Sequence, residues 1–482
     1  MNLYFWTMIT DKVKFYHLLL DEFPFTATLS QERLLQALSY FVFDKNKEAL
    51  FLLKGYAGTG KTTSISAFVS NLWQVGAKFV LLAPTGRAAK VIANYSHKSA
   101  FTIHKKIYLP KKAKGGSVNF VLKPNKHSNT IFIVDEASMI PDSPSGIKLF
   151  ESGSLLSDLI QYVYNGKNCK LVLIGDTAQL PPVKLNLSPA LDEKVLSYDF
   201  DKEVRIIELD EVMRQHKDSG ILTNATEIRT VLSEFYKGIE FRFQLNYPDI
   251  VRLIDGYDIE AAIDESYRNN GIEETAIIVR SNKRANQYNQ QIRYKIRSQE
   301  NEISTGDFIM VVKNNYFWLN ENDDADFIAN GDICEIMRIQ SYKELYGFQF
   351  VELTLRMIDY PNQKPFETVV MLDTLTSETP SLSYEESNRL YNAVKEDFLE
   401  LPKYKQYQEI KKNKYFNALQ IKFSYAMTCH KSQGGQWNTV FIEQPFLPDG
   451  TDISYYRWLY TAVTRAQKKL YLIGFTDEFF DR

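Results

Sequence analysis

A loop with the residues of a phosphate-binding site follows the first long apolar run of the chain. Residues 55–62 read GYAGTGKT and lie between the apolar run 49–53 and a helical pattern. This order, G-x-x-x-x-G-K-[ST], lets backbone N–H groups turn around a phosphate, and the N-terminus of the next helix faces the same anion. Lys61 would reach the β- and γ-phosphates of a nucleoside triphosphate, and the Thr62 hydroxyl would hold Mg²⁺. The residues predicted to contact the nucleotide are Gly55, Gly58, Thr59, Gly60, Lys61, Thr62 and Thr63.

An acidic pair, Asp135 and Glu136, directly follows the apolar run 131–134. At the end of a buried strand, the first carboxylate could bind Mg²⁺ and the second could act as the base for an attacking water. Acidic pairs in this position are otherwise solvated turns. The distance behind the phosphate loop favours the functional interpretation, so we predict Asp135 as a metal ligand and Glu136 as catalytic.

Three further side chains are candidates for the hydrolytic step. Gln179 lies in the segment 175–182, GDTAQLPP, where its amide could sense the γ-phosphate or orient the water. Arg214 and Arg465 are far down the chain, and a guanidinium that faces the γ-phosphate from across a cleft stabilises charge in the transition state. It would also make hydrolysis depend on domain closure. The alternative is that each is an ordinary surface or interface arginine.

The elements that must hold these residues form two alternating series. The runs 79–83, 131–134 and 170–174 are continuously apolar, which is typical of strands buried on both faces of a parallel sheet. Each ends in a polar cluster, where an open α/β sheet places its ligand site. A second alternating region begins near residue 206. It is interrupted over about 302–415 by several strands and a charged helical stretch, 384–413, and it resumes at Ile421.

Composition sets broad limits. The net charge of -2 neither predicts nor excludes nucleic-acid binding, which follows local charge. Residues 105–128 carry seven lysines and no acidic residue, so this stretch is either a solvated loop or a grip on nucleic acid. The cysteines, Cys169, Cys334 and Cys429, match no metal spacing and are expected to be thiols in a reducing compartment. With no secretory signal or membrane-spanning run, we expect a cytoplasmic, nucleoid-associated protein.

In order, the motifs resemble those of a superfamily 1 helicase, and within it the RecD/Dda-like branch of superfamily 1B, which includes Pif1-related helicases. The residues similar to motifs I, Ia, Ib, II, III, IV, V and VI are 55–62, 83–89, 102–104, 135–139, 175–182, 212–214, 426–434 and 460–466. The resemblance implies ATP as the nucleotide. It adds Gln31 as the residue that reads adenine and Gly434 as a further nucleotide contact. It also implies DNA contacts by Thr85, His104, Thr428 and His430, although a lone histidine is more often structural.

The resemblance further implies an α/β fold with two RecA-like domains. The first would carry a small β-hairpin insertion and the second an SH3-like β insertion. The expected parts are a leader (1–25), the first RecA-like domain (26–104 and 129–204), the hairpin (105–128), the second RecA-like domain (205–301 and 416–482) and the β insertion with a helical arm (302–415). The hairpin lies where the family places the wedge that splits a duplex. Tyr316, Phe317 and Trp318 would either stack on bases or belong to the core of the insertion.

We therefore predict a monomeric, ATP-dependent DNA helicase that moves 5′-3′ on single-stranded DNA and unwinds duplexes in replication, repair or recombination. Its expected partners are single-stranded DNA, junctions of single- and double-stranded DNA, and single-strand-binding or recombination proteins, with no membrane. The alternative is a single-stranded DNA translocase that serves as the ATPase subunit of a larger recombination complex and unwinds poorly alone. A non-catalytic switch is disfavoured because no expected hydrolysis residue is missing.

Overall fold

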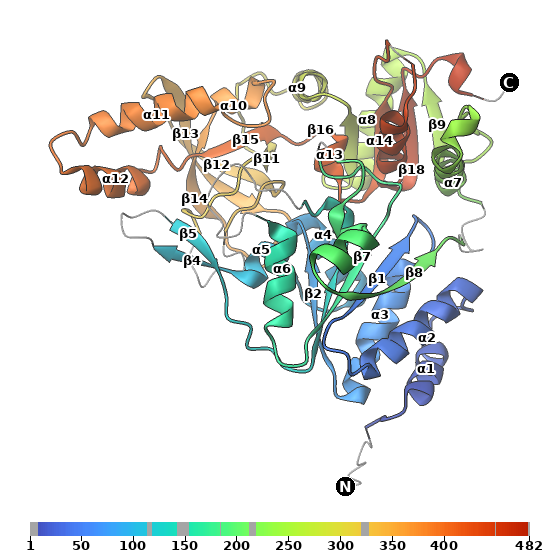
Figure 1. The fold of residues 1–482 in the computed structure, drawn as a ribbon. Coiled ribbons are helices and arrows are strands. Elements are labelled where there is room, and N and C mark those ends of the chain that lie inside the picture. Colours follow the sequence, from blue (N-terminus) through green and yellow to red (C-terminus); the bar gives the residue numbers. More distant parts are fainter. Residues whose placement is uncertain are drawn as a thin grey trace, which may run out of the picture.

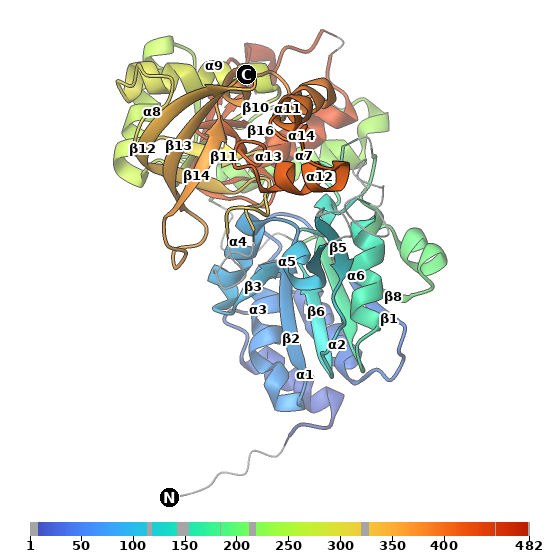
Figure 2. The same cartoon turned by 90° about the vertical axis from the view of Figure 1, so that its left-hand side faces the viewer.

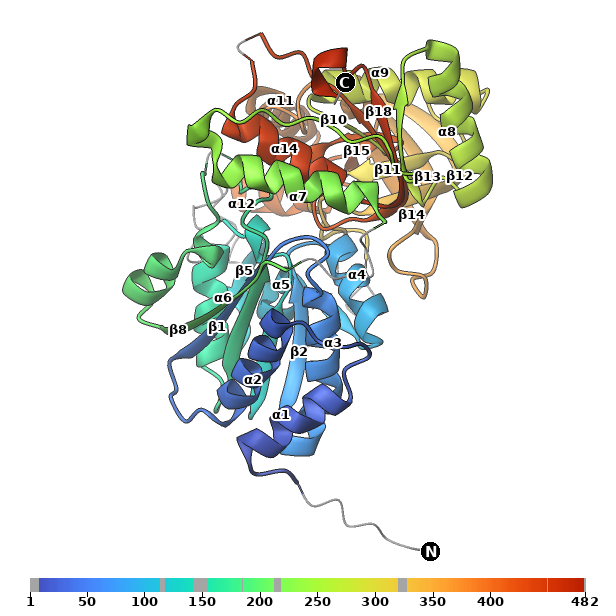
Figure 3. The ribbon, with the colours of Figure 1, turned by 90° about the vertical axis from the view of Figure 1, so that its right-hand side faces the viewer.

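The computed structural model describes residues 8–112, 118–141, 154–183, 185–211, 218–319, 327–448 and 450–480. Two lobes lie one above the other in Figure 1, with the N-terminal half of the chain in the lower lobe. The views in Figures 2 and 3 show the same two-lobe arrangement from the sides. Within the described part of the chain, every helix is too short or too polar to cross a bilayer.

The strands, in chain order, are β1 (Ala49–Gly55), β2 (Lys78–Ala83), β3 (Ala100–Thr102), β4 (Tyr108–Lys112), β5 (Val118–Leu122), β6 (Thr130–Val134), β7 (Lys170–Gly175), β8 (Glu203–Leu209), β9 (Ile250–Leu253), β10 (Thr275–Val279), β11 (Phe308–Val311), β12 (Ile333–Leu345), β13 (Phe348–Met357), β14 (Phe366–Met371), β15 (Leu419–Phe423), β16 (Ala426–Thr428), β17 (Trp437–Glu443) and β18 (Ala466–Ile473). The α-helices are α1 (Lys12–Asp21), α2 (Leu29–Phe43), α3 (Lys61–Asn71), α4 (Gly86–Ser96), α5 (Ile103–Ile107), α6 (Leu155–Tyr164), α7 (Gly220–Ser233), α8 (Gly256–Asn270), α9 (Asn282–Gln291), α10 (Asp373–Thr376), α11 (Tyr384–Glu396), α12 (Lys403–Lys412), α13 (Cys429–Ser432) and α14 (Ile453–Val463).

The lower lobe, which we call the first unit, is built on a parallel sheet of six strands in the order β3-β2-β6-β7-β1-β8. Successive side chains of its central strands face opposite cores. Leu50 and Leu52 pack with α5 and α6, whereas Phe51 and Leu53 pack with α1, α2 and α3. Both faces are therefore buried, which explains why these strands read as unbroken apolar runs. Because the strands are parallel, β1, β6 and β7 end at the same edge.

The upper lobe contains a second parallel sheet and a closed barrel. The sheet, which defines the second unit, has the strand order β16-β10-β17-β18-β9, and α7 and α14 lie side by side next to it (Figure 3). Strands β11 to β15 close the barrel, in which β14 and β15 pair in parallel. Strand β15 leads almost directly into β16, so the barrel is an insertion in the second unit. The predicted fold class, two parallel α/β sheets with a β insertion in the second, is confirmed.

A helical arm and a hairpin project on the same side of the molecule in Figure 1. The arm consists of α11 and α12, whose Leu390, Val394 and Ile410 pack on Phe348 and Phe350 of the barrel. The hairpin pairs β4 with β5 in antiparallel register, from Tyr108↔Leu122 to Lys112↔Val118. It falls inside the stretch 105–128 that the sequence marks as an insertion.

Two of the expected boundaries differ from the observed elements. Residues 12–21 form α1, whose Phe15 and Leu19 are fully buried in the core of the first unit, so much of the expected leader packs as part of that unit. The expected boundary at residue 205 cuts through β8. Residues Glu203–Leu209 pair with β1 along its whole length and complete the edge of the first sheet. The other domain limits stay predictions.

A buried ion pair joins the barrel to the second unit. The Arg293 guanidinium, just beyond α9, lies 3.0 Å from the Asp307 carboxylate, and the two side chains are 7% and 0% exposed. Tyr425, between β15 and β16, donates its hydroxyl to Asp307 at 2.8 Å, and the backbone N–H of Ser304 donates at 2.7 Å. This one carboxylate therefore holds together three segments at the junction where the barrel enters and leaves the sheet.

We expect Asp307→Ala to destabilise the protein by about 3–5 kcal/mol, because it leaves the Arg293 charge buried without its partner. Urea denaturation followed by tryptophan fluorescence measures this. The control is Asp264→Ala, which removes the exposed ion pair with Arg268 on α8 and should cost at most about 1 kcal/mol. Equal losses for the two variants would contradict the role assigned to the junction.

Candidate active site

The phosphate loop has the backbone that its sequence predicts. It leaves β1 at Gly55 and enters α3 at Lys61, with Gly58 and Gly60 at φ of 74° and 81°, a region that glycine adopts without strain. The Lys61 ammonium donates to the carbonyls of Gly55 and Tyr56, both at 2.7 Å. A Cβ on Gly55 would lie 2.9 Å from the Lys61 side chain, so glycine leaves room for the lysine stem. The ammonium is held directly over the loop.

The acidic pair stands at the end of β6, beside the phosphate loop. The Glu136 backbone N–H donates to Asp135 Oδ1 at 2.9 Å, and Glu136 itself has a φ of 54°, which is unusual for a non-glycine residue. Burial and the neighbouring Glu136 raise the pKa of Asp135 to about 6, while the Lys61 ammonium acts in the opposite direction. Backbone strain and a desolvated carboxylate together are typical of a functional site. Asp135 and Thr62 line the same small pocket beside Lys61, as the predicted metal ligands require.

A cavity of about 630 Å³ lies between the two units and collects most of the predicted hydrolysis residues. From the first unit it is lined by the phosphate loop, the acidic pair and Gln179, and from the second unit by Arg465. The predicted residues on its walls are Gly58, Gly60, Lys61, Thr62, Thr63, Asp135, Glu136, Gln179 and Arg465. This volume lies within the range of nucleotide-sized ligand sites.

Arg465 spans the cleft to the acidic pair. Its guanidinium Nη1 lies 3.9 Å from Glu136 Oε1, and the side chain is only 3% exposed. It is held in its own unit because Nε donates to the Thr461 carbonyl and Nη1 to the Gly435 carbonyl, both at 3.1 Å. Gln179 is also buried, and among the described residues its Oε1 has no hydrogen-bond partner. A buried acceptor left unpaired at such a wall is suited to a ligand or a reacting water.

Four other predicted nucleotide contacts are not among the residues that line this cavity. Gln31 is fully buried, and its amide donates to the Thr59 carbonyl at 3.0 Å while its oxygen accepts from the Thr28 N–H, so it ties the start of α2 to the phosphate loop. Gly434 lies against α4, where a Cβ would meet the Ala88 side chain at 2.8 Å. Gly55 and Thr59 belong to the loop but are not among the cavity walls. Arg214, the other arginine predicted to face the γ-phosphate from across the cleft, lies in the segment 212–217, outside the described residues.

The predicted DNA-contacting residues come from both units. Thr85 caps α4, accepting from the Ala88 N–H at 3.2 Å, and lies beside Gly434 of the second unit. Thr428 precedes α13, which contains His430. His104 lies on α5, 5.7 Å from the ring of Tyr108, and burial lowers the pKa of His104 to about 4. It is therefore neutral at physiological pH and would act through hydrogen bonds rather than charge.

The three aromatic side chains of residues 316–318 lie in three different environments. Trp318 packs in the barrel and donates its indole N–H to the Asn417 carbonyl at 2.9 Å, whereas Tyr316 packs against the core of the first unit. Phe317 is 38% exposed. The core interpretation thus fits Trp318, and Tyr316 forms a contact between the barrel and the first unit.

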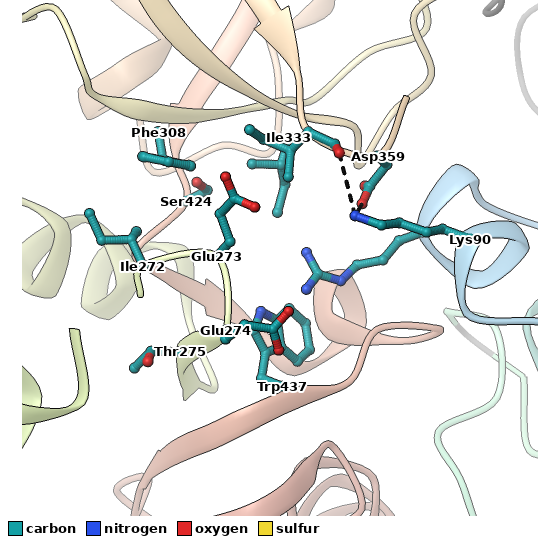
Figure 4. A pocket seen from close by; sticks show the side chains of 12 residues that line it. Lys90, Ile272, Glu273, Glu274, Thr275, Phe308, Ile333, Asp359, Ser424 and Trp437 are labelled. Atoms are coloured by element: carbon teal, nitrogen blue, oxygen red, sulfur yellow. Dashed lines mark hydrogen bonds and ion pairs between the residues drawn. The ribbon is translucent and has the colours of Figure 1, made fainter. Parts of the chain in front are cut away.

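A second contact between the units lies at α4. Lys90 forms an ion pair with Asp359 of the barrel at 3.2 Å, shown in Figure 4. The Arg87 guanidinium lies 4.0 Å from the ring centroid of Trp437, and the cavity beside these side chains holds only about 30 Å³. Since this volume accommodates about one water, the contact is a packed interface rather than a ligand site.

Sequence reasoning missed Asp176 and Tyr460, which are buried at the same cleft. Both fall inside sequence motifs that also contain predicted site residues, Gln179 in one and Arg465 in the other. Its position five residues before Arg465 could have marked Tyr460 as a candidate site residue. However, packing decides which face of the helix Tyr460 occupies.

Comparison with known proteins agrees with this geometry. The model of the AAA domain family matches residues 30–234, and that of the UvrD-like helicase C-terminal domain matches residues 423–473. The chain is 33% identical to the ATP-dependent RecD2 DNA helicase of Deinococcus radiodurans over 139 residues, which cover 29% of this chain and 17% of that protein. It is 26% identical to the ATP-dependent DNA helicase dda of Enterobacteria phage T4 over 274 residues, which cover 55% and 57%.

The chain is related to the superfamily 1B helicases RecD2 and Dda. It spans less than two thirds of the length of both relatives. Among solved structures, the Pif1 helicase from Bacteroides in complex with ADP-AlF3 and ssDNA matches with 15% identity and a TM-score of 0.41, over 94% of each chain. In this chain, the segments similar to motifs I, II and III meet the segment similar to motif VI across one cavity.

We expect Arg465→Ala to lower the turnover number for ATP about 10³-fold while changing ATP affinity far less. The reason is that a guanidinium facing the γ-phosphate from across the cleft stabilises charge that develops in the transition state. Steady-state ATPase assays and equilibrium titration with a fluorescent ATP analogue separate the two effects. The matched control is Arg457→Ala. Arg457 is also on α14 and donates to the Asn186 carbonyl of the first unit, but it does not line the cavity. Equal losses of turnover and affinity in Arg465→Ala would make Arg465 a simple binding residue.

Proposed function

We propose that the chain is an ATP-dependent DNA helicase that moves 5′-3′ on single-stranded DNA and separates the strands of duplex DNA. The observation that carries the proposal is the Arg465 guanidinium 3.9 Å from Glu136, across the cavity that contains Lys61. A site divided between two units hydrolyses ATP only when the units are closed, which is how hydrolysis becomes movement. The 5′-3′ direction comes from the resemblance to superfamily 1B.

Each side chain has a distinct part in hydrolysis. Lys61 would hold the β- and γ-phosphates, and Glu136 would accept the proton of the attacking water, which Gln179 would orient. Thr62 and Asp135 supply the oxygen ligands that Mg²⁺ prefers, and the bound ion would neutralise charge on the phosphates.

The same closure would move the DNA. Thr85 and His104 belong to the first unit, and Thr428 and His430 belong to the second. Hydroxyl and imidazole groups of this kind hold phosphates and carry little sequence information. Closing the cleft would therefore shift one pair of contacts relative to the other by about a nucleotide, and reopening would advance the strand.

The test is strand separation of partial duplexes that carry either a 5′ or a 3′ single-stranded tail, with ATP and Mg²⁺. We expect unwinding from the 5′ tail and none from the 3′ tail, and no unwinding by Lys61→Ala, because the loop then lacks the ammonium that would hold the β- and γ-phosphates. Unwinding from the 3′ tail would retain a helicase and contradict the direction. DNA-stimulated ATPase without unwinding from either tail would favour the translocase subunit.

A variant of the β4–β5 hairpin can distinguish a helicase from a translocase that does not unwind DNA. Its base is anchored, because the Tyr108 hydroxyl donates to Asp158 at 2.6 Å and the Lys123 N–H donates to the Ile107 carbonyl at 2.7 Å. Replacing residues 111–119 with a short Gly-Ser linker keeps this base. We expect the variant to lose unwinding but to keep translocation, measured by displacement of streptavidin from biotinylated single-stranded DNA. Full unwinding by the variant would show that the hairpin is not the wedge.

A further inference from the structure

The hydroxyl of Tyr460 joins the two units at the phosphate loop itself. Tyr460 lies on α14 and is 1% exposed. Its oxygen accepts a hydrogen bond from the backbone N–H of Ala57 at 3.0 Å and lies 2.7 Å from Asp176 Oδ2. Since an N–H can only donate, the single phenolic hydrogen must be donated to the Asp176 carboxylate. The hydroxyl is therefore satisfied on both sides, by two different motifs of the first unit.

Asp176 extends this contact into the loop that carries Gln179. It is 1% exposed and follows the last residue of β7. Its Oδ1 accepts from the Ala178 N–H at 2.9 Å, and its backbone carbonyl accepts from the Gln179 N–H at 3.4 Å. One carboxylate thus shapes the turn with one oxygen and receives Tyr460 with the other. A change at the hydroxyl is transmitted to both the phosphate loop and the turn that presents Gln179.

The same helix also sets the place of Arg465. The Leu180 N–H donates to the Thr461 hydroxyl at 2.8 Å, and the Arg465 Nε donates to the Thr461 carbonyl at 3.1 Å. Arg465 lies just beyond the end of α14, where Thr464 is the C-cap. The distance between α14 and the first unit, which Tyr460 and Thr461 hold, therefore determines how far the Arg465 guanidinium reaches toward Glu136.

We infer that Tyr460 is a positioning residue for ATP hydrolysis: its hydroxyl bridges the Ala57 amide and the Asp176 carboxylate, and so aligns Arg465 and Gln179 with the phosphate loop. The inference rests on the proposed function and extends it to a residue that was not predicted to take part in hydrolysis. Tyr460 does not line the 630 Å³ cavity, so it acts through its neighbours rather than on the nucleotide.

The chain offers a matched control on the same helix. Tyr455 is also fully buried in α14, and its hydroxyl donates to Gln444 Oε1 at 2.7 Å. Gln444 follows β17 of the second unit, so this hydrogen bond stays within one unit. Tyr460→Phe and Tyr455→Phe remove the same atom from the same helix, and they differ in whether the lost hydrogen bond crosses the cleft.

The first measurement is hydrogen–deuterium exchange of the full-length protein without nucleotide. In Tyr460→Phe the Ala57 N–H loses its acceptor, so we expect peptides that cover residues 55–60 to exchange about tenfold faster than in the unaltered protein. Tyr455→Phe should leave these peptides unchanged. Unchanged exchange of residues 55–60 in Tyr460→Phe would overturn the inference without reference to any activity.

The second measurement is DNA-stimulated ATPase. For Tyr460→Phe we expect the turnover number to fall about tenfold while the KM for ATP stays within about twofold, because alignment in the transition state is lost rather than ground-state binding. A raised KM at unchanged turnover, or equal effects of the two tyrosine variants, would overturn the inference. Absence of ATPase in the unaltered protein would instead contradict the proposed function, and exchange would still decide whether the bridge to Ala57 exists.

Discussion

The structure depends on the hydrogen bonds by which α14 meets the carboxyl edge of the first sheet. Parallel strands bring the phosphate loop, the acidic pair and the Asp176 turn to one edge, because β1, β6 and β7 are neighbours in the sheet. A positive group, the Arg465 guanidinium, faces that edge from the second unit. Tyr460 and Thr461 hold α14 there, and Arg465 completes the cavity. Neither unit contains the whole site.

The barrel also contacts both units. It leaves the second sheet after α9 and returns through β15, which leads almost directly into β16 and Thr428. The buried Asp307 carboxylate holds this junction, and the contacts of Lys90 with Asp359 and of Tyr316 with the first core join the barrel to the first unit. Movement of one unit relative to the other must therefore rearrange the barrel contacts as well. This gives a physical route from the nucleotide cleft to the surfaces proposed to hold DNA.

Local patterns and tertiary packing account for different parts of the prediction. The strand limits were nearly right wherever both faces of a strand are buried, since a short continuous apolar run that ends in a polar cluster is typical of such a strand. The boundary at residue 205 was misplaced because β8 is an edge strand in which only Leu209 is buried, and its partner β1 is about 150 residues away in sequence. Helix α1 was taken for a leader because its two buried side chains, Phe15 and Leu19, show their role only when packed on α2.

The sequence by itself determined which side chains are candidates for chemistry: a phosphate loop, an acidic pair, a glutamine and a distant arginine, whose order along the chain indicates a function that no single one of them does. Tertiary structure decided which of them meet. Gln31 hydrogen bonds to the phosphate loop and Gly434 packs on α4, and Tyr460, which lies in motif VI but was not a predicted site residue, reaches the phosphate loop. The physical reason is that a motif encodes short-range backbone geometry, whereas contact across a cleft depends on how two separately folded sheets pack against each other.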